Sequence, residues 1–250
     1  MAGAALHGRL NWLAADVVAI VEETRHVHSV DLRVPGWKGH VPGQHVDIRL
    51  TAEDGYQAQR SYSIATPERG ENITITVELV EGGEVSPYLI EDLQVGDRFE
   101  MRGPIGGYFV WDPALGGPLQ LIAGGSGVVP LMCMTRALAI ADSAIPSRLL
   151  LSARSWEDVI YREELQRLAE QMSSMQVHYT LTREQPPGWS GYSRRVDLDL
   201  LAETVWPAAE GPLIYVCGPT GFVETVASAM IELGNDPRRV KTERFGPTGG

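Results

Sequence analysis

The sequence is poor in cysteine and has no long hydrophobic run. Its two cysteines, Cys133 and Cys217, lie far apart and cannot by themselves form a zinc or iron–sulfur site. No stretch approaches the roughly 20 apolar residues of a membrane span. The segment 1–10 lacks the hydrophobic core of a signal peptide. We therefore expect a cytoplasmic protein with reduced thiols, no metal site and no membrane contact.

Basic residues are scarce as well. The chain has 21 Lys and Arg against 32 Asp and Glu, a net charge of −11, which makes nucleic acid and anionic membranes poor partners. Its 250 residues, 44% of them hydrophobic, are typical of a globular protein with one large or two medium domains. We expect a monomer.

The two halves of the chain differ in pattern. Short strands predicted near 17–21, 28–34, 46–50, 61–64, 73–80 and 99–102, with one helix near 86–93, indicate a small antiparallel barrel. After the Pro/Gly-rich stretch 112–118, strands near 119–123, 148–152, 176–181, 213–217 and 240–243 alternate with helical patterns near 131–142, 156–172 and 221–233 and a helix-like piece beginning at 197–201. This alternation predicts a doubly wound parallel sheet. We place the domains at 8–113 and 116–250.

The run 119–127 joins a predicted buried strand to four small residues, Gly124-Gly125-Ser126-Gly127, and Pro130 follows where a helix would begin. A strand, a glycine turn and a helix together present backbone N–H groups to a phosphate. The spacing is G-x-G-x-x-P rather than G-x-G-x-x-G, so a glycine-rich turn between two core elements is an equal alternative.

Other stretches also carry chemical potential. Arg60-Ser61-Tyr62-Ser63 lies on a predicted strand, where Arg60 and Tyr62 share one face. Ser86 suits a helix N-cap and Pro87 the first helical position, which gives a second potential anion site. Cys217-Gly218-Pro219 ends a predicted parallel strand, the edge where ligands bind in such sheets. An edge strand, a capped helix and a small core residue are the structural alternatives.

These motifs, in this order and together with Arg102-Gly103-Pro104, resemble the ferredoxin–NADP reductase superfamily over nearly the whole chain, from about Val17 to Phe245. The likeness is to the bacterial type without its own iron–sulfur domain. It implies an N-terminal FAD-binding barrel followed by an NAD(P)-binding α/β domain.

The resemblance also implies roles for particular residues. Arg60 would pair with the flavin phosphates, Tyr62 would pack on the isoalloxazine ring, and Ser63 would bond near its N5 atom. Near the nicotinamide, Cys217 and Glu243 would support hydride transfer, with Ser63, and Phe245 would shield the flavin face. The remaining implied contacts are Ser61, Gly83, Val85 and Ser86 to the flavin, and Gly125, Ser126, Gly127, Pro130, Gly218 and Pro219 to the nicotinamide dinucleotide. The tail 246–250 after Phe245 departs from the plant-type pattern.

Arginines follow the second and third strands of the α/β half. By resemblance to bacterial members, Arg154, Arg183 and Arg195, helped by Thr182, would hold the 2′-phosphate of NADPH. Arg194 stands where a small residue is expected. Solvated surface arginines are the alternative interpretation.

We therefore expect a flavoprotein oxidoreductase that transfers a hydride from NADPH to bound FAD and passes electrons to a separate redox protein, such as a ferredoxin or an oxygenase component. Two alternatives stay open at this point. One is a reductase of free flavin or a small molecule, and the other is an electron-transfer subunit of a larger complex. The sequence does not separate FAD from FMN.

Overall fold

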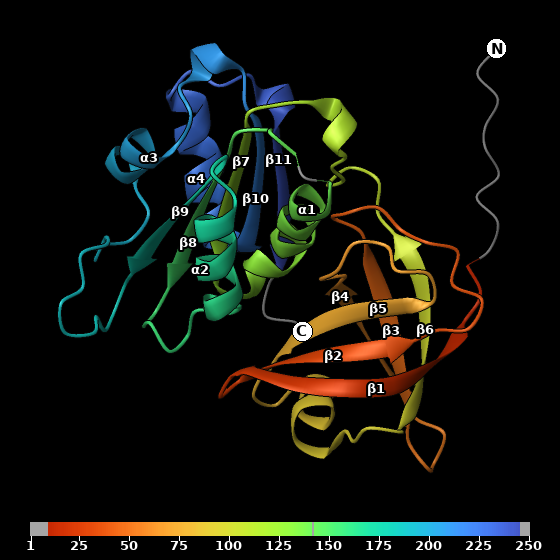
Figure 1. Cartoon of the computed structure of the whole chain (residues 1–250). Coiled ribbons are helices and arrows are strands. Elements are labelled where there is room, and N and C mark those ends of the chain that lie inside the picture. Colours follow the sequence, from red (N-terminus) through yellow and green to blue (C-terminus); the bar gives the residue numbers. More distant parts are fainter. Residues whose placement is uncertain (1–9, 142, 246–250) are drawn as a thin grey trace, which may run out of the picture.

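The computed structural model describes residues 10–141 and 143–245. Figure 1 shows an antiparallel barrel built by the first part of the chain beside a helix-flanked parallel sheet built by the second. Both parts have the fold class that the sequence predicts.

The barrel contains six antiparallel strands in the order β4-β3-β6-β1-β2-β5. Its two edge strands meet through a bridge between Ile64 and Ile75, and the Ala65 N–H donates to the Thr74 carbonyl at 2.8 Å. Alternate side chains such as Val30, Ile48 and Met101 are fully buried and fill the interior. The strands are β1 (Leu13–Thr24), β2 (Val27–Arg33), β3 (His45–Thr51), β4 (Gln57–Ser63), β5 (Asn72–Glu78) and β6 (Arg98–Ile105).

One helical turn, η1 (Tyr88–Asp92), packs on the barrel close to the predicted helix. The prediction that Ser86 caps this helix is wrong. The Ser86 Oγ accepts a hydrogen bond from the Val80 N–H at 3.0 Å, so it closes the preceding loop instead. The glycine loop at 82–83 is short enough to bring these two groups together.

The second part is a five-stranded parallel sheet in the order β11-β10-β7-β8-β9. Chain direction along the sheet reverses between β7 and β10, which is the topological switch point where ligands bind in such folds. The strands are β7 (Leu119–Gly124), β8 (Ser147–Ala153), β9 (Met175–Leu181), β10 (Leu213–Pro219) and β11 (Val240–Phe245).

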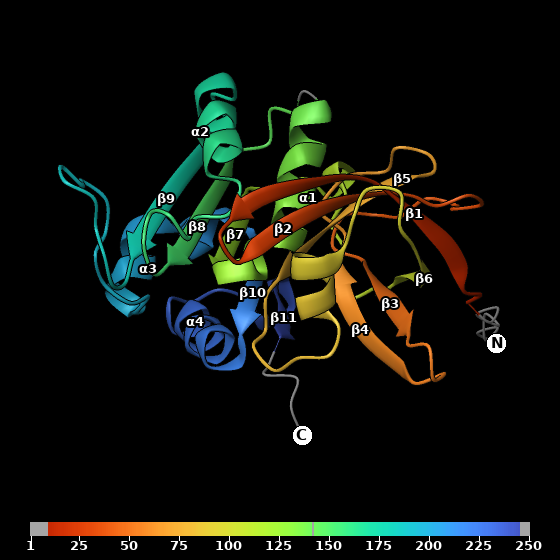
Figure 2. The ribbon, with the colours of Figure 1, turned by 90° about the horizontal axis from the view of Figure 1, so that it is seen from below.

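Helices cover both faces of this sheet. Leu121 of β7 packs in one apolar cluster with α1 and α2, whereas its neighbour Ile122 packs in another with α3 and α4. Figure 2 shows α1 and α2 on one side of the sheet and α4 on the other. The helices are α1 (Val128–Ile140), α2 (Arg162–Gln171), α3 (Leu198–Thr204) and α4 (Thr220–Glu232), with 3-10 turns η2 (Pro113–Leu115), η3 (Gly125–Gly127), η4 (Ala208–Glu210) and η5 (Pro237–Arg239).

Three boundaries differ from the predictions. A 3-10 turn precedes α1, so Pro130 is the third helical residue rather than the first; its missing N–H is still harmless in the first turn. Gly218 and Pro219 belong to β10 rather than to a turn. The helix α2 begins only at Arg162, because Tyr161 adopts a left-handed conformation with φ of 58°.

Polar contacts join the two parts. The Arg136 guanidinium donates to the Glu164 carboxylate at 2.9 and 2.6 Å and to the Ala65 carbonyl of the barrel at 2.8 Å. The buried Tyr161 hydroxyl shares a hydrogen bond with Thr76 of β5. These contacts explain the left-handed turn at Tyr161, which aims the phenol at the barrel.

Within residues 10–141 and 143–245, no helix is long and apolar enough to cross a bilayer. The same residues contain no cluster of His, Cys, Asp and Glu side chains arranged to hold a metal ion.

Candidate active site

A cavity of about 1080 Å³ lies between the barrel and the parallel sheet, at the switch point between β7 and β10. Its walls come from β4, the loop after β5, the glycine turn η3 and the ends of β10 and β11. The predicted site residues that line it are Arg60, Ser61, Tyr62, Ser63, Gly83, Val85, Ser86, Ser126, Cys217, Glu243 and Phe245.

Strand β4 presents Arg60 and Tyr62 along one face, as its extended backbone requires. The Arg60 guanidinium donates to Glu84 at 3.0 Å, so a charged partner already holds it in the cavity wall. Ser61 points to the other face, where its hydroxyl donates to Asp47 at 2.6 Å. The Ser61 hydroxyl is therefore committed to a barrel contact.

The loop after β5 forms a tight wall beside Arg60. A Cβ atom added at Gly83 would lie 3.0 Å from the Val80 carbonyl oxygen and 3.3 Å from Ser86 Oγ, which is closer than nearly all such contacts. Val85 is fully buried beneath the loop. The backbone at this wall can be approached closely because no side chain stands on Gly83.

The glycine turn packs directly against β10. A Cβ atom on Gly127 would lie 2.1 Å from the Cys217 carbonyl oxygen, so only glycine fits here. Helix α1 begins behind the turn with no side-chain cap, which leaves its first N–H groups available to a ligand. The Ser126 hydroxyl donates to Glu78 of the barrel at 2.5 Å.

Cys217 and Glu243 are register partners on β10 and β11 at the deep end of the cavity. Burial raises the pKa of Glu243 to about 7, and its Oε2 atom is buried with no hydrogen-bond partner in the part of the chain that the structure describes. Burial, with the Glu243 carboxylate adding to it, raises the pKa of the Cys217 thiol well above its usual range. The thiol is therefore neutral at physiological pH.

His45 also reaches this end of the cavity, although the sequence gave no signal for it. It pairs with Ser63 across β3 and β4, and its Nδ1 atom lies 4.0 Å from Glu243 Oε1. Burial lowers the pKa of His45. Other cavity residues that the sequence analysis missed include Gln59, Thr76, Glu78, Val80 and Val129, which are ordinary strand, loop and helix residues without a motif.

The arginines expected at the 2′-phosphate lie at the carboxyl edge of β8 and β9, outside the cavity. The Arg183 N–H donates to the Arg154 carbonyl at 2.9 Å, and the Thr182 hydroxyl donates to the Ala153 carbonyl at 3.2 Å. Arg195 follows a segment that runs beside β9. None of these three arginines forms an ion pair within the described residues, whereas Arg194 pairs with Glu203 at 2.8 Å.

Nine predicted contact residues do not line the cavity: Gly125, Gly127, Pro130, Arg154, Thr182, Arg183, Arg195, Gly218 and Pro219. Gly127 and Gly218 shape its wall through the close packing of the glycine turn on β10. The tail 246–250 lies outside the described residues.

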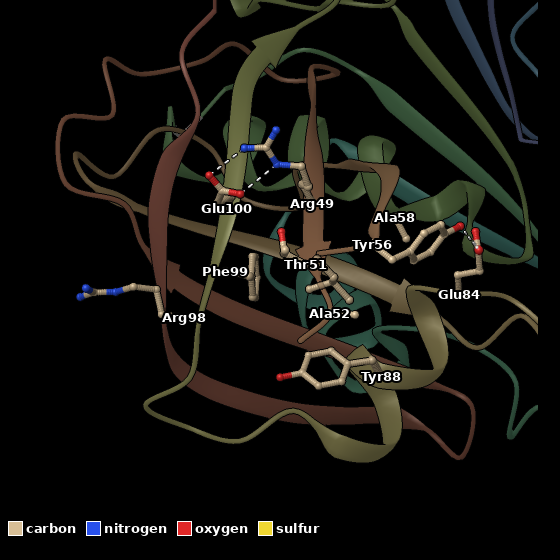
Figure 3. A pocket seen from close by; sticks show the side chains of 11 residues that line it. Arg49, Thr51, Ala52, Tyr56, Ala58, Glu84, Tyr88, Arg98, Phe99 and Glu100 are labelled. Atoms are coloured by element: carbon tan, nitrogen blue, oxygen red, sulfur yellow. Dashed lines mark hydrogen bonds and ion pairs between the residues drawn. The ribbon is translucent and has the colours of Figure 1, made fainter. Parts of the chain in front are cut away.

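A second pocket of about 480 Å³ opens beside the β3–β4 hairpin and shares Glu84 with the large cavity. Figure 3 shows the rings of Phe99 and Tyr88 at this pocket, with the Arg49–Glu100 ion pair at one end and the Tyr56–Glu84 contact at another. Its walls are mostly apolar side chains.

The residues present fit the two implied cofactors. The large cavity has the volume for the reactive halves of two dinucleotides. Gly83 and Gly127 allow close approach to backbone on the barrel side and on the sheet side, respectively. The unpartnered Glu243 oxygen leaves one polar group in the wall that a ligand could satisfy.

Two family models match the chain in sequence. One, described as an oxidoreductase FAD-binding domain, matches residues 15–110. The other, described as an oxidoreductase NAD-binding domain, matches residues 121–228.

Curated relatives agree with these matches. Ferredoxin–NADP reductase B of Sorangium cellulosum is 35% identical over 209 residues, which cover 81% of this chain and 84% of that protein. The glycine betaine monooxygenase reductase subunit of Pseudomonas aeruginosa is 32% identical over 210 residues, which cover 83% of this chain. The match spans only 56% of the length of that reductase subunit.

Solved structures show the same two-part fold. The FAD/NAD-binding domain of a Vibrio cholerae nitric oxide dioxygenase superposes with a TM-score of 0.84 at 26% identity, covering 94% of this chain and 99% of that one. A cytochrome P450 reductase of Amycolatopsis gives 0.83 at 29% identity, covering 98% and 74%. The chain belongs to the ferredoxin–NADP reductase family, the NAD(P)H-dependent oxidoreductases that join a FAD-binding domain to an NAD-binding domain.

Proposed function

We propose that this protein uses NADPH to reduce FAD bound in the large cavity and then delivers the electrons to a separate redox protein, an oxygenase component or a ferredoxin. The cavity carries this proposal, because the barrel supplies one wall and the ends of β10 and β11 supply the opposite one. Two nucleotide cofactors bound to the two walls would meet at Ser63, Cys217 and Glu243. Relatives named as reductase components of oxygenases support the choice of acceptor.

The barrel wall would hold the flavin. Arg60 would exchange the Glu84 carboxylate for the flavin phosphates, a bidentate contact that suits a guanidinium. Tyr62 would pack on the ring system, and Ser63 would lie at its reactive edge. The backbone of Gly83 and Val85 and the Ser86 hydroxyl would complete the pyrophosphate contacts, with Ser61 behind them.

The sheet wall would hold the nicotinamide dinucleotide. The turn Gly125–Gly127 and the first turn of α1, with Pro130, would receive its pyrophosphate. Gly218 and Pro219 would support the nicotinamide beside Cys217, whose neutral thiol adds no charge where the hydride passes. Phe245, the half-buried end of β11, would shield the flavin until the nicotinamide arrives.

The bound flavin supplies the hydride-accepting centre, and the chain itself supplies position and exclusion of water. Only Glu243, whose pKa of about 7 lies near neutral pH, is poised to hold or release a proton in this cavity.

The preference for NADPH is part of the same proposal. Arg154, Thr182 and Arg183 lie together at the edge of β8 and β9, and Arg195 follows a neighbouring segment. In a chain with a net charge of −11, arginines without an ion-pair partner in the described residues suit an anionic ligand.

An anaerobic titration of the FAD-loaded protein tests the proposal. We expect NADPH to bleach the visible flavin absorbance, and to do so faster than NADH at equal concentration. A protein that binds neither FAD nor FMN would refute the flavin site, and equal rates would refute the NADPH preference. Loss of all flavin on gel filtration would favour a reductase of free flavin instead.

A further inference from the structure

We propose that the 480 Å³ pocket beside the β3–β4 hairpin, here called the adenine pocket, binds the adenosine half of FAD. Its walls include Leu50, Ala52, Ala58, Tyr88 and Phe99. This inference rests on the proposed flavin site and adds a binding region that lies outside the large cavity. It makes the protein select FAD over FMN.

The strand β4 provides the spatial argument. Ala58, Arg60 and Tyr62 share one face of this strand, and they span about 13 Å at roughly 3.3 Å per residue. Tyr62 and Arg60 line the large cavity, whereas Ala58 lines the adenine pocket. A flavin with its ring at Tyr62 and its phosphates at Arg60 would therefore send its remaining half toward Ala58.

Glu84 lies at the junction and lines both cavities. Its carboxylate accepts hydrogen bonds from Arg60 at 3.0 Å and from the Tyr56 hydroxyl at 2.5 Å. A carboxylate between a phosphate site and a base site is placed where a ribose lies, and it can accept from the ribose hydroxyl groups. Phosphate, ribose and base would thus meet Arg60, Glu84 and the adenine pocket in that order.

The adenine pocket has the chemistry of a purine site. The Phe99 ring is 7% exposed and the Tyr88 ring 38% exposed, and small side chains at Ala52 and Ala58 leave the space open (Figure 3). Arg49 is held by a bidentate ion pair with Glu100, at 2.8 Å for both contacts, so it is not free to bind a further phosphate. A flat, neutral base fits these walls better than an anion does.

Calorimetric titration of the flavin-free protein tests the inference. We expect FAD to bind at least 100-fold more tightly than FMN, and ADP to bind in competition with FAD. Ala52→Trp fills the pocket from its exposed rim and should weaken FAD at least tenfold while leaving FMN unchanged. Ala114→Trp, at an exposed alanine of η2, serves as the matched control for an added indole.

The outcomes separate this inference from the proposed function. Equal affinity of the wild-type protein for FAD and FMN, or equal weakening of both by Ala52→Trp, would overturn the adenine pocket and leave the flavin site standing. Failure of the wild type to bind either flavin would refute the flavin site itself. If Ala52→Trp instead weakens 2′,5′-ADP binding to the FAD-loaded protein, the pocket belongs to the nicotinamide dinucleotide and the inference is wrong.

Discussion

The buried carboxyl of Glu243 should make the folded protein less stable as the pH rises. Burial raises the pKa of Glu243 from its ordinary value of 4.5 to about 7. Between these two values the native state retains a proton that the unfolded state has released. Because the native state binds more protons, the free energy of unfolding falls with increasing pH across this window.

The size of this loss follows from the shift. At 1.36 kcal/mol per pKa unit, the shift corresponds to about 3 kcal/mol, lost between about pH 4.5 and pH 7 and absent below that window. The Glu243 side chain is 28% exposed, which places the expected value nearer 2 kcal/mol. His45 at 4.0 Å does not remove the penalty while its ring is neutral.

Urea unfolding of the flavin-free protein at pH 5, 6, 7 and 8 measures the effect. We expect Glu243→Gln to gain about 2 kcal/mol over the wild type between pH 5 and pH 8, because the amide carries no charge to desolvate. Glu232→Gln, at an exposed carboxyl of α4, should leave the pH dependence unchanged. Parallel curves for the wild type and Glu243→Gln would refute the reasoning.

Three further outcomes can be measured. Arg183→Ala should raise the KM for NADPH far more than for NADH, by an amount equivalent to about 1.5–3 kcal/mol for a charged hydrogen bond; equal effects would contradict the 2′-phosphate assignment. Glu78→Gln removes a carboxylate that occupies the glycine-turn hydroxyl at 2.5 Å. It should lower the Kd for NADP⁺ about tenfold in calorimetry, because repulsion at ~5 Å near a protein surface amounts to about 1–3 kcal/mol; an unchanged or higher Kd would contradict this. Gly127→Ala would place Cβ 2.1 Å from the Cys217 carbonyl oxygen and should lower the free energy of unfolding by at least about 1–3 kcal/mol in urea; Gly221→Ala, with open space around it, is the control, and equal stability of both variants would contradict the packing argument.

The sequence by itself determined the order and kind of the elements. Alternation in β3, the β-branched run of β5 and the buried run of β7 are local patterns, and local backbone preference with side-chain periodicity is enough to specify them. The glycine turn after β7 was equally visible, because glycine marks a close approach wherever it occurs.

Local signals failed where distant contacts decide the backbone. The predicted helix at 156–172 begins only at Arg162, since Tyr161 turns to meet Thr76 of the barrel. Ser86 bonds to Val80 rather than capping a helix. In both cases a contact formed by tertiary folding replaces the one that local preference favours.

The candidate site shows the same division. The sequence supplied the motif residues on each wall, such as Arg60 and Cys217, but only the folded chain brings His45 and Glu78 into the same cavity. Closure of the barrel and docking of the sheet also bury Glu243, which shifts its pKa. Burial and charge environment depend on what lies across a cavity in space, and neighbours in sequence do not encode that.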